Sequence, residues 1–242
     1  MEYITVVTGS LEENCHVIYK NNRCVIADPG GNPEKILEEI NRLNLIPEGI
    51  ILTHTHFDHI GGLGGILDKY DIPVYVSEID FKRIAINDNS SVYYMKYEIP
   101  QERVIFVSDG YEIKLSEFKV KVMSTPGHSK GSLCYFVDNL MITGDTLFYQ
   151  SIGRYDLEGG SFEEIKRTFK DKIMKIKENY ILLCGHGENS TLKYELSNNP
   201  YIRYFVSNWN IFYTKNLKYT KKVLDILLIT WYNNKVAKEM RV

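Results

Sequence analysis

Three histidines and one aspartate gather in one short stretch of this chain. These side chains, His54, His56, Asp58 and His59, lie within six residues and follow an apolar run at 49–53 that is typical of a buried strand. In extended chain, alternate side chains share a face, and a following turn can bring His59 beside them. Imidazole and carboxylate groups bind zinc, iron or manganese. Four such groups pointing in two directions suit two adjacent metal ions better than one closed tetrahedral site.

Three further potential ligands follow expected strands later in the chain. His128, Asp145 and His186 come directly after apolar runs and have glycines close by. Glycine lets the backbone approach a ligand closely, and α/β sheets collect their ligands where strands end. We therefore expect all seven side chains to meet in one cluster.

Strands and helices must position these ligands. Expected strands lie at 3–7, 14–19, 23–28, 49–53, 73–76, 104–106, 111–115, 118–123, 133–137, 140–143 and 181–184. Expected helices lie at 33–43, 60–70, 78–86 and 161–177, with Ser77 and Ser161 as caps of the last two. A second half is expected to begin near Val104. A tyrosine-rich stretch at 87–98 is interpreted as a loop or lid, and His16 as a packed or surface histidine.

Composition indicates an ordinary globular protein. Of the 242 residues, 44% are hydrophobic and 25% are charged. No run approaches the roughly 18 apolar residues of a membrane span, and the N-terminus lacks the features of a signal peptide. Four cysteines without CxxC spacing favour free thiols in a reducing cytosol. We therefore expect a cytoplasmic protein.

A basic, aromatic extension follows the main domain. We expect a domain over 1–200 and a helical extension over 201–242, where eight Lys/Arg and two Asp/Glu give a balance of +6 against −2 for the whole chain. A helix at 221–238 would pack on the domain, form a homodimer contact, clamp an anionic substrate or meet a membrane surface. The acidic main domain argues against a nucleic-acid partner, although the basic extension leaves RNA processing open.

The ligand spacing resembles that of a known family. His54-Thr55-His56-Phe57-Asp58-His59 is similar to the H-x-H-x-D-H signature of metallo-β-lactamase fold hydrolases, and the resemblance runs from about residue 4 to 202. Blocks at 125–132, 144–148 and 185–187 resemble the glyoxalase II, or hydroxyacylglutathione hydrolase, branch. The resemblance implies an α/β protein, a four-layer αββα sandwich with metals at one edge.

The resemblance also implies a role for each ligand. It assigns a first divalent metal to His54, His56 and His128, a second to Asp58, His59 and His186, and the bridging position to Asp145. Zinc is expected, with iron or manganese as alternatives. Asp28, in an Asp-Pro-Gly block, would support the metal loop without binding metal, and a simple turn aspartate is the other interpretation.

The resemblance implies that such a centre hydrolyses a thioester. Two cations that share one water lower its pKa to about 7, and the bridging hydroxide, oriented by Asp58, would attack the acyl carbonyl. A thiolate leaves without a strong general acid. By resemblance, Arg154 would bind a glutathione carboxylate with Tyr155 nearby, although Asp156 makes this match partial. The expected substrate is S-(2-hydroxyacyl)glutathione or a related acyl thiol.

Other functions stay open. A mononuclear iron persulfide dioxygenase would use His54, His56 or His128 and Asp145, and would leave Asp58, His59 and His186 without metal. A lactone or phosphodiester hydrolase would keep the centre and change the substrate. Purely structural metals are disfavoured, because structural sites are closed whereas this glycine-rich edge is expected to be open.

Overall fold

Two six-stranded sheets form the centre of the computed structural model, which describes residues 1–85 and 99–211. The first sheet has the order β1 (Glu2–Thr8), β2 (Glu13–Lys20), β3 (Arg23–Ala27), β4 (Ile46–Ile51), β5 (Val74–Val76), β6 (Val104–Phe106). The second has the order β14 (Ser190–Thr191), β13 (Ile181–Cys184), β10 (Leu140–Gly144), β9 (Leu133–Val137), β8 (Lys119–Ser124), β7 (Glu112–Lys114). A small third sheet pairs β11 (Leu147–Phe148) with β12 (Ser151–Ile152).

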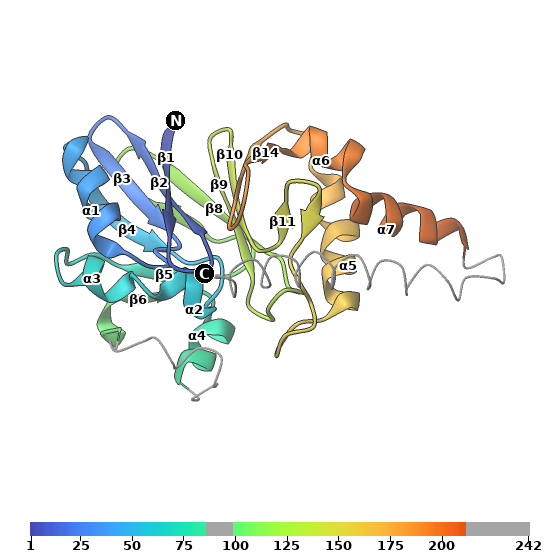
Figure 1. Ribbon diagram of the computed structural model, residues 1–242, viewed down its shortest axis with the longest axis horizontal. Coiled ribbons are helices and arrows are strands. Elements are labelled where there is room, and N and C mark those ends of the chain that lie inside the picture. The colour runs from blue at the N-terminus through green and yellow to red at the C-terminus, as the bar shows by residue number, and fades with distance from the viewer. Residues whose placement is uncertain (86–98, 212–242) are drawn as a thin grey trace, which may run out of the picture. The chain divides into compact units, whose positions relative to one another are not determined.

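Helices cover the outer faces of both large sheets (Figure 1). The helices of the described residues are α1 (Pro33–Arg42), α2 (Phe57–Ile60), α3 (Leu63–Leu67), α4 (Glu78–Ala85), α5 (Phe162–Asp171), α6 (Leu192–Asn198) and α7 (Pro200–Ile211), with 3-10 turns η1 (Gln101–Arg103) and η2 (Ile173–Lys175). Apolar side chains form one layer under α1 and α3, a second between the sheets, and a third under α5 and α6. The predicted four-layer αββα sandwich is confirmed.

The inner strands show why both sheet faces are covered. Val17 of β2 packs in the layer under α1, whereas the next residue, Ile18, packs between the sheets, and both are fully buried. Consecutive strand residues point to opposite faces, so a strand covered on both sides needs a continuous apolar run. Each such side chain stabilises the fold by roughly 1.5–3 kcal/mol when fully buried.

Three predicted elements differ from the structure. The helix expected at 60–70 is shorter, since α3 covers only Leu63–Leu67 and a separate short helix, α2, ends at Ile60. The strand at 104–106 does not begin the second sheet; as β6 it pairs in parallel with β5 of the first. The helix expected at 161–177 ends at Asp171 and is followed by η2.

Several predictions lie outside the described residues. They include the tyrosine-rich stretch at 87–98, the helix at 221–238 and the homodimer contact. Residues 1–205 form one compact unit, and the domain boundary at 200 stays a prediction. Among the described helices, none has the length and apolar character needed to cross a bilayer. The cysteines are buried free thiols, as predicted.

Candidate metal centre

The loop after β4 carries four of the predicted ligands. His54 lies in the irregular segment after β4, and His56, with an extended backbone (φ −64°, ψ 150°), is the residue before α2. Because α2 begins at Phe57, its turn brings His59 back beside the extended segment, and the His54 and His59 ring centroids lie 4.0 Å apart. The chain therefore turns as the spacing predicts.

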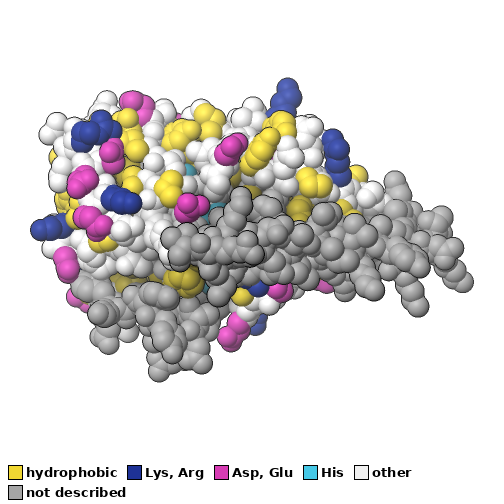
Figure 2. Space-filling view, in the orientation of Figure 1, with side chains coloured by type: hydrophobic (Ala, Val, Ile, Leu, Met, Phe, Trp, Pro, Cys, Tyr) yellow, Lys and Arg dark blue, Asp and Glu magenta, His cyan; other side chains and the backbone are white. Residues whose placement is uncertain are grey.

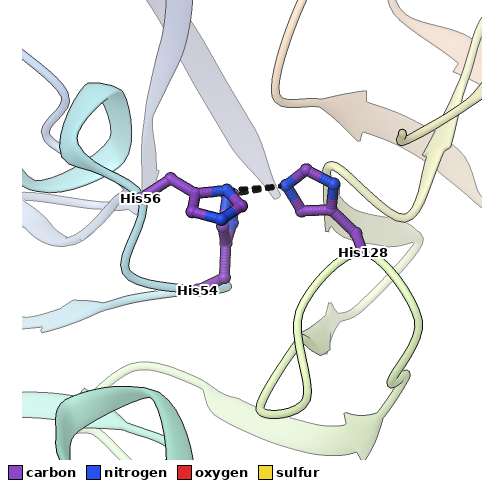
Figure 3. Close-up of side chains that lie close together, drawn as sticks. All are labelled: His54, His56 and His128. Atoms are coloured by element: carbon purple, nitrogen blue, oxygen red, sulfur yellow. Dashed lines mark hydrogen bonds between the residues drawn. The ribbon is translucent and has the colours of Figure 1, made fainter. Parts of the chain in front are cut away.

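Three imidazoles from two loops converge on one point, with His128 on the side opposite His54 and His56 (Figure 3). His128 Nε2 lies 3.2 Å from His54 Nε2 and 2.8 Å from His56 Nδ1. His128 follows β8 of the second sheet, whereas the other two follow β4 of the first. Ligand nitrogens about 2.0–2.1 Å from a tetrahedral zinc lie roughly 3.3 Å apart. This first ligand group, His54, His56 and His128, therefore has the spacing of a metal site.

A second ligand group, Asp58, His59 and His186, combines a carboxylate with two imidazoles. His186 Nε2 lies 3.2 Å from Asp58 Oδ2, and His59 Nε2 lies 3.9 Å from the same oxygen. His186 comes from the loop after β13, so this group also takes ligands from both sheets. Mixed nitrogen and oxygen ligands suit zinc, iron or manganese.

Asp145 lies between the two ligand groups. Its Oδ2 is 3.4 Å from His128 Nε2 of the first group, and its Oδ1 is 3.3 Å from His59 Nε2 of the second. Among the described residues, Asp145 Oδ1 and His59 Nε2 are buried without a hydrogen-bond partner of good geometry. Leaving a buried polar atom unpaired costs about 1–3 kcal/mol, and a bound cation would offset that cost. The residues present therefore fit two metal ions.

Ligand imidazoles are oriented through their other nitrogen. His128 Nδ1 lies 2.7 Å from the carbonyl oxygen of Arg154, and His186 Nδ1 lies 3.1 Å from that of Leu11. A ring that donates a hydrogen bond through Nδ1 presents the lone pair of Nε2 to a metal. Backbone carbonyls thus fix the direction of both rings.

Asp28 supports the loop from behind. Its Oδ1 accepts a hydrogen bond from Thr53 N at 2.7 Å, and its Oδ2 faces Thr53 Oγ1 at 2.5 Å and His59 Nδ1 at 3.1 Å. Asp28 is also close enough to His54 and His59 to join them as a potential ligand. Its oxygens are already used by these donors, so the geometry favours support over coordination.

A comparison with known families adds to this geometry. The family model described as the metallo-beta-lactamase superfamily matches residues 8–186, which include every predicted ligand. The chain belongs to this superfamily. As a metallo-β-lactamase superfamily protein with ligand groups of this composition, it is a metal-dependent hydrolase by family.

Individual superfamily members are similar over most of the chain. A Bacillus subtilis protein named probable metallo-hydrolase YqgX is 33% identical, and the match covers 85% of this chain and 99% of that protein. Hydroxyacylglutathione hydrolase GloC of Haemophilus influenzae is 25% identical, with 80% and 94% covered. Among solved structures, BLEG-1 B3 metallo-beta-lactamase has a TM-score of 0.76 at 32% identity and covers 83% of this chain and 99% of its own. TTHA1623, solved in a di-iron-bound form, has a TM-score of 0.71 at 31% identity, with 82% and 99% covered.

The superfamily centre is open on one side in this chain. The side chains of His186, Asp58 and Asp145 are 20%, 13% and 12% exposed. Histidine atoms are visible near the middle of the described surface in Figure 2. A catalytic zinc site keeps one coordination position for water or substrate, and the partial exposure of these side chains leaves the second ligand group a side on which such a position could be reached.

The two ligand groups differ in charge. Burial lowers the pKa of His54 and His128 and lowers that of His56 to about 3, so these rings are neutral and ready to bind metal. Burial opposes charge on His59 and His186 as well, but the neighbouring Asp145 and Asp58 carboxylates raise the pKa of both rings. Before metal binds, the imidazoles of the second group therefore hold their protons more tightly than those of the first group.

Metal binding at the two groups should depend differently on pH. A metal competes with protons for His59 and His186, whose pKa values are raised above the ordinary 6.5, so affinity at the second group should rise by roughly tenfold or more per pH unit as the pH increases towards and past that value. The first group is already deprotonated there, so its affinity should stay nearly constant. Zinc titration calorimetry in two buffers of different ionisation enthalpy would measure the released protons. His186→Ala is the control, since only the pH-insensitive zinc-binding step, at the first group, should remain in this variant. Equal pH dependence of the two zinc-binding steps in the wild-type protein would contradict this interpretation.

The two predicted substrate-binding residues have contacts within the chain. The Arg154 guanidinium donates to both carboxylate oxygens of Asp156, at 2.9 and 3.0 Å. Tyr155 packs against Phe162 in the layer under α5, with ring centroids 4.9 Å apart. Substrate binding by either residue stays a prediction, and a substrate carboxylate would compete with Asp156 for the guanidinium.

Two buried polar residues of β2 lie beside the centre and were not predicted from the sequence as site residues. Glu13 is fully buried, its Oε1 lies 3.8 Å from His59 Nδ1, and burial raises the pKa of its carboxyl well above the usual range. Asn14 donates through Nδ2 to the carbonyls of Cys184 and Gly187, both at 2.9 Å. The available signal was the pair of polar residues at the start of an otherwise apolar strand.

Proposed function

We propose that this metal-dependent hydrolase is a dinuclear thioester hydrolase that acts on S-(2-hydroxyacyl)glutathione or a related acyl thiol. The observation that carries the dinuclear part is Asp145, whose two oxygens face different ligand groups at 3.4 and 3.3 Å. Zinc is the proposed metal, with iron or manganese as alternatives.

The chain's own residues would perform most of the work. Two cations, when bound, would share and acidify a water and polarise the acyl carbonyl. Asp58, at the open side of the centre, would accept a hydrogen bond from that water and aim it at the carbonyl carbon. The leaving thiolate is stable in water, so the site needs no strong general acid. The fold alone does not fix the substrate; the thioester is favoured by the likeness to hydroxyacylglutathione hydrolase GloC.

A persulfide dioxygenase is less well supported. Such an enzyme would need one iron and would leave the second ligand group empty. That group has a carboxylate and two imidazoles within reach of one another, and Asp145 presents a separate oxygen to it. This arrangement favours two metals.

A hydrolysis panel tests the proposal. The substrates are S-lactoylglutathione, a simple acyl-CoA, a lactone, a phosphodiester and a β-lactam, with metal analysis on the same sample. Two metals per chain and fastest turnover of S-lactoylglutathione are expected. One iron per chain, with oxygen uptake when a persulfide is added, would favour the dioxygenase over the proposed hydrolase. Fastest turnover of another compound in the panel would show that the proposed substrate is wrong.

Arg154→Glu tests the glutathione part. A charge-assisted hydrogen bond contributes about 1.5–3 kcal/mol, so KM for S-lactoylglutathione should rise roughly 10- to 100-fold. KM for a neutral thioester should change much less, because His128 is oriented by the backbone carbonyl of residue 154, which the substitution keeps. Steady-state kinetics on both substrates measures the difference. Equal effects on both would remove the reason to name glutathione.

A further inference from the structure

Asp80, in the first turn of α4, is a fully buried carboxylate outside both ligand groups. Its Oδ2 accepts a hydrogen bond from Ser129 Oγ at 2.6 Å, and its Oδ1 accepts one from Gly131 N at 2.8 Å. Its backbone carbonyl accepts a third from Thr55 Oγ1 at 3.0 Å. One residue thus contacts the loops after β4 and after β8.

In each of the two loops, the residue that contacts Asp80 is a sequence neighbour of the first ligand group. Thr55 lies between His54 and His56, and Ser129 directly follows His128. The two loops belong to different sheets, so their separation is not fixed by a shared strand ladder. Asp80 ties them together through its side chain on one side and its backbone on the other.

The loop after β8 is built around this carboxylate. Ser132 Oγ accepts a hydrogen bond from Ser129 N at 3.0 Å and lies 2.7 Å from Ser129 Oγ, which fixes the hydroxyl that donates to Asp80. A Cβ on Gly131 would lie 2.5 Å from Asp80 Oδ1, so a side chain there would push the carboxylate away. The loop is therefore shaped to receive Asp80.

We propose that Asp80 is a positioning residue that sets the distance between His128 and the pair His54 and His56, and thereby the metal affinity of the first ligand group. The second group is held by other contacts, which include Asp28 to His59 and the Leu11 carbonyl to His186. Removing Asp80 should therefore weaken one metal step and spare the other. This inference rests on the proposed two-metal function.

The test compares Asp80→Ala with Asp80→Asn by zinc titration against a chelator. Loss of a residue that orients a metal ligand typically costs 10–100-fold in affinity. Asp80→Ala should weaken zinc affinity by roughly 10–100-fold in the binding step that His56→Ala abolishes. In the other zinc-binding step, affinity should fall by less than about threefold. Asn can accept from Gly131 N and donate to the Ser129 hydroxyl, so Asp80→Asn should stay within a few-fold of wild type.

Glu195→Ala is the matched control. Glu195 is also a fully buried helix carboxylate, and it accepts hydrogen bonds from Gln150 N and Asn199 Nδ2, both at 2.9 Å, away from the ligands. Its loss should lower thermal stability and leave both zinc steps unchanged. Wild-type affinities in folded Asp80→Ala, or equal losses in the Asn and Ala variants, would overturn the proposal.

A milder variant covers the case in which Asp80→Ala does not fold. Ser129→Ala removes only the hydroxyl that donates to Asp80 and should weaken the same zinc step by roughly tenfold; unchanged affinity there would also overturn the proposal. If wild type itself binds no second zinc, the two-metal function fails instead, so the two failures are distinguishable.

Discussion

Replacing His56 with alanine should abolish hydrolysis and empty the first ligand group while the chain stays folded. His56 Nδ1 lies 2.8 Å from His128 Nε2, and it supplies one of the group's three imidazoles. A metal that polarises a carbonyl supplies several kcal/mol, so its loss should slow hydrolysis by roughly 10³-fold or more. Elemental analysis, steady-state kinetics and a circular dichroism melt on one preparation would measure the three quantities.

His16 provides the control for a buried histidine. Its Nδ1 lies 3.0 Å from Thr5 Oγ1 and its Nε2 lies 3.1 Å from the Cys184 carbonyl, outside both ligand groups. Burial lowers the pKa of His16 to about 4, so of the packed or surface histidine that the sequence predicted, the structure shows the packed one. His16→Gln should lower stability but keep both metals. Substantial hydrolysis by His56→Ala would contradict the assignment of the first group.

Asp145→Asn should slow hydrolysis about as much as His56→Ala does, but for a different physical reason. The substitution keeps the shape and removes the negative charge that lies between the ligand groups. An amide offers one oxygen rather than two, so it cannot serve both metals. We expect metal content to fall from two per chain to about one, and hydrolysis to fall by roughly 10²–10⁴-fold. Zinc titration and kinetics would follow both changes.

Asp156→Asn is the control for Asp145→Asn. Asp156 is a nearby exposed aspartate that pairs with Arg154 and faces neither ligand group. Its substitution should leave metal content unchanged. If Asp145→Asn also retains two metals with wild-type affinity, Asp145 does not bridge them.

Local patterns explain why so much of the fold and the centre could be predicted. Strand ends are marked by an apolar run followed by a polar residue, with glycine directly before His128, Asp145 and His186 but not before His54, and this signal placed all four at one edge of the sandwich. The alternation at 54–58 and the helix start after it depend only on neighbouring residues. For that reason the direction in which His59 turns was also within reach.

Contacts between distant segments could not be predicted in this way. Asn14 meets Cys184 and Asp80 meets Gly131 only because the two sheets pack face to face. Gly185 shows the same limit: a Cβ there would lie 2.4 Å from Asp145 Oδ1, a close approach that no local pattern records. The pairing of Arg154 with Asp156 was missed because side-chain direction in a loop has no periodicity.

The division of the proposed ligands between the two sheets would make metal supply a determinant of how long the polypeptide persists. His54, His56, Asp58 and His59 belong to one sheet, and His128, Asp145 and His186 to the other. Ions bound there would fasten the halves together, and any ion that binds only the native state adds RT ln(1 + [L]/Kd), about 2.7 kcal/mol at a hundredfold excess over Kd. A cell starved of the ion would therefore lose the enzyme to proteolysis as well as to inactivity.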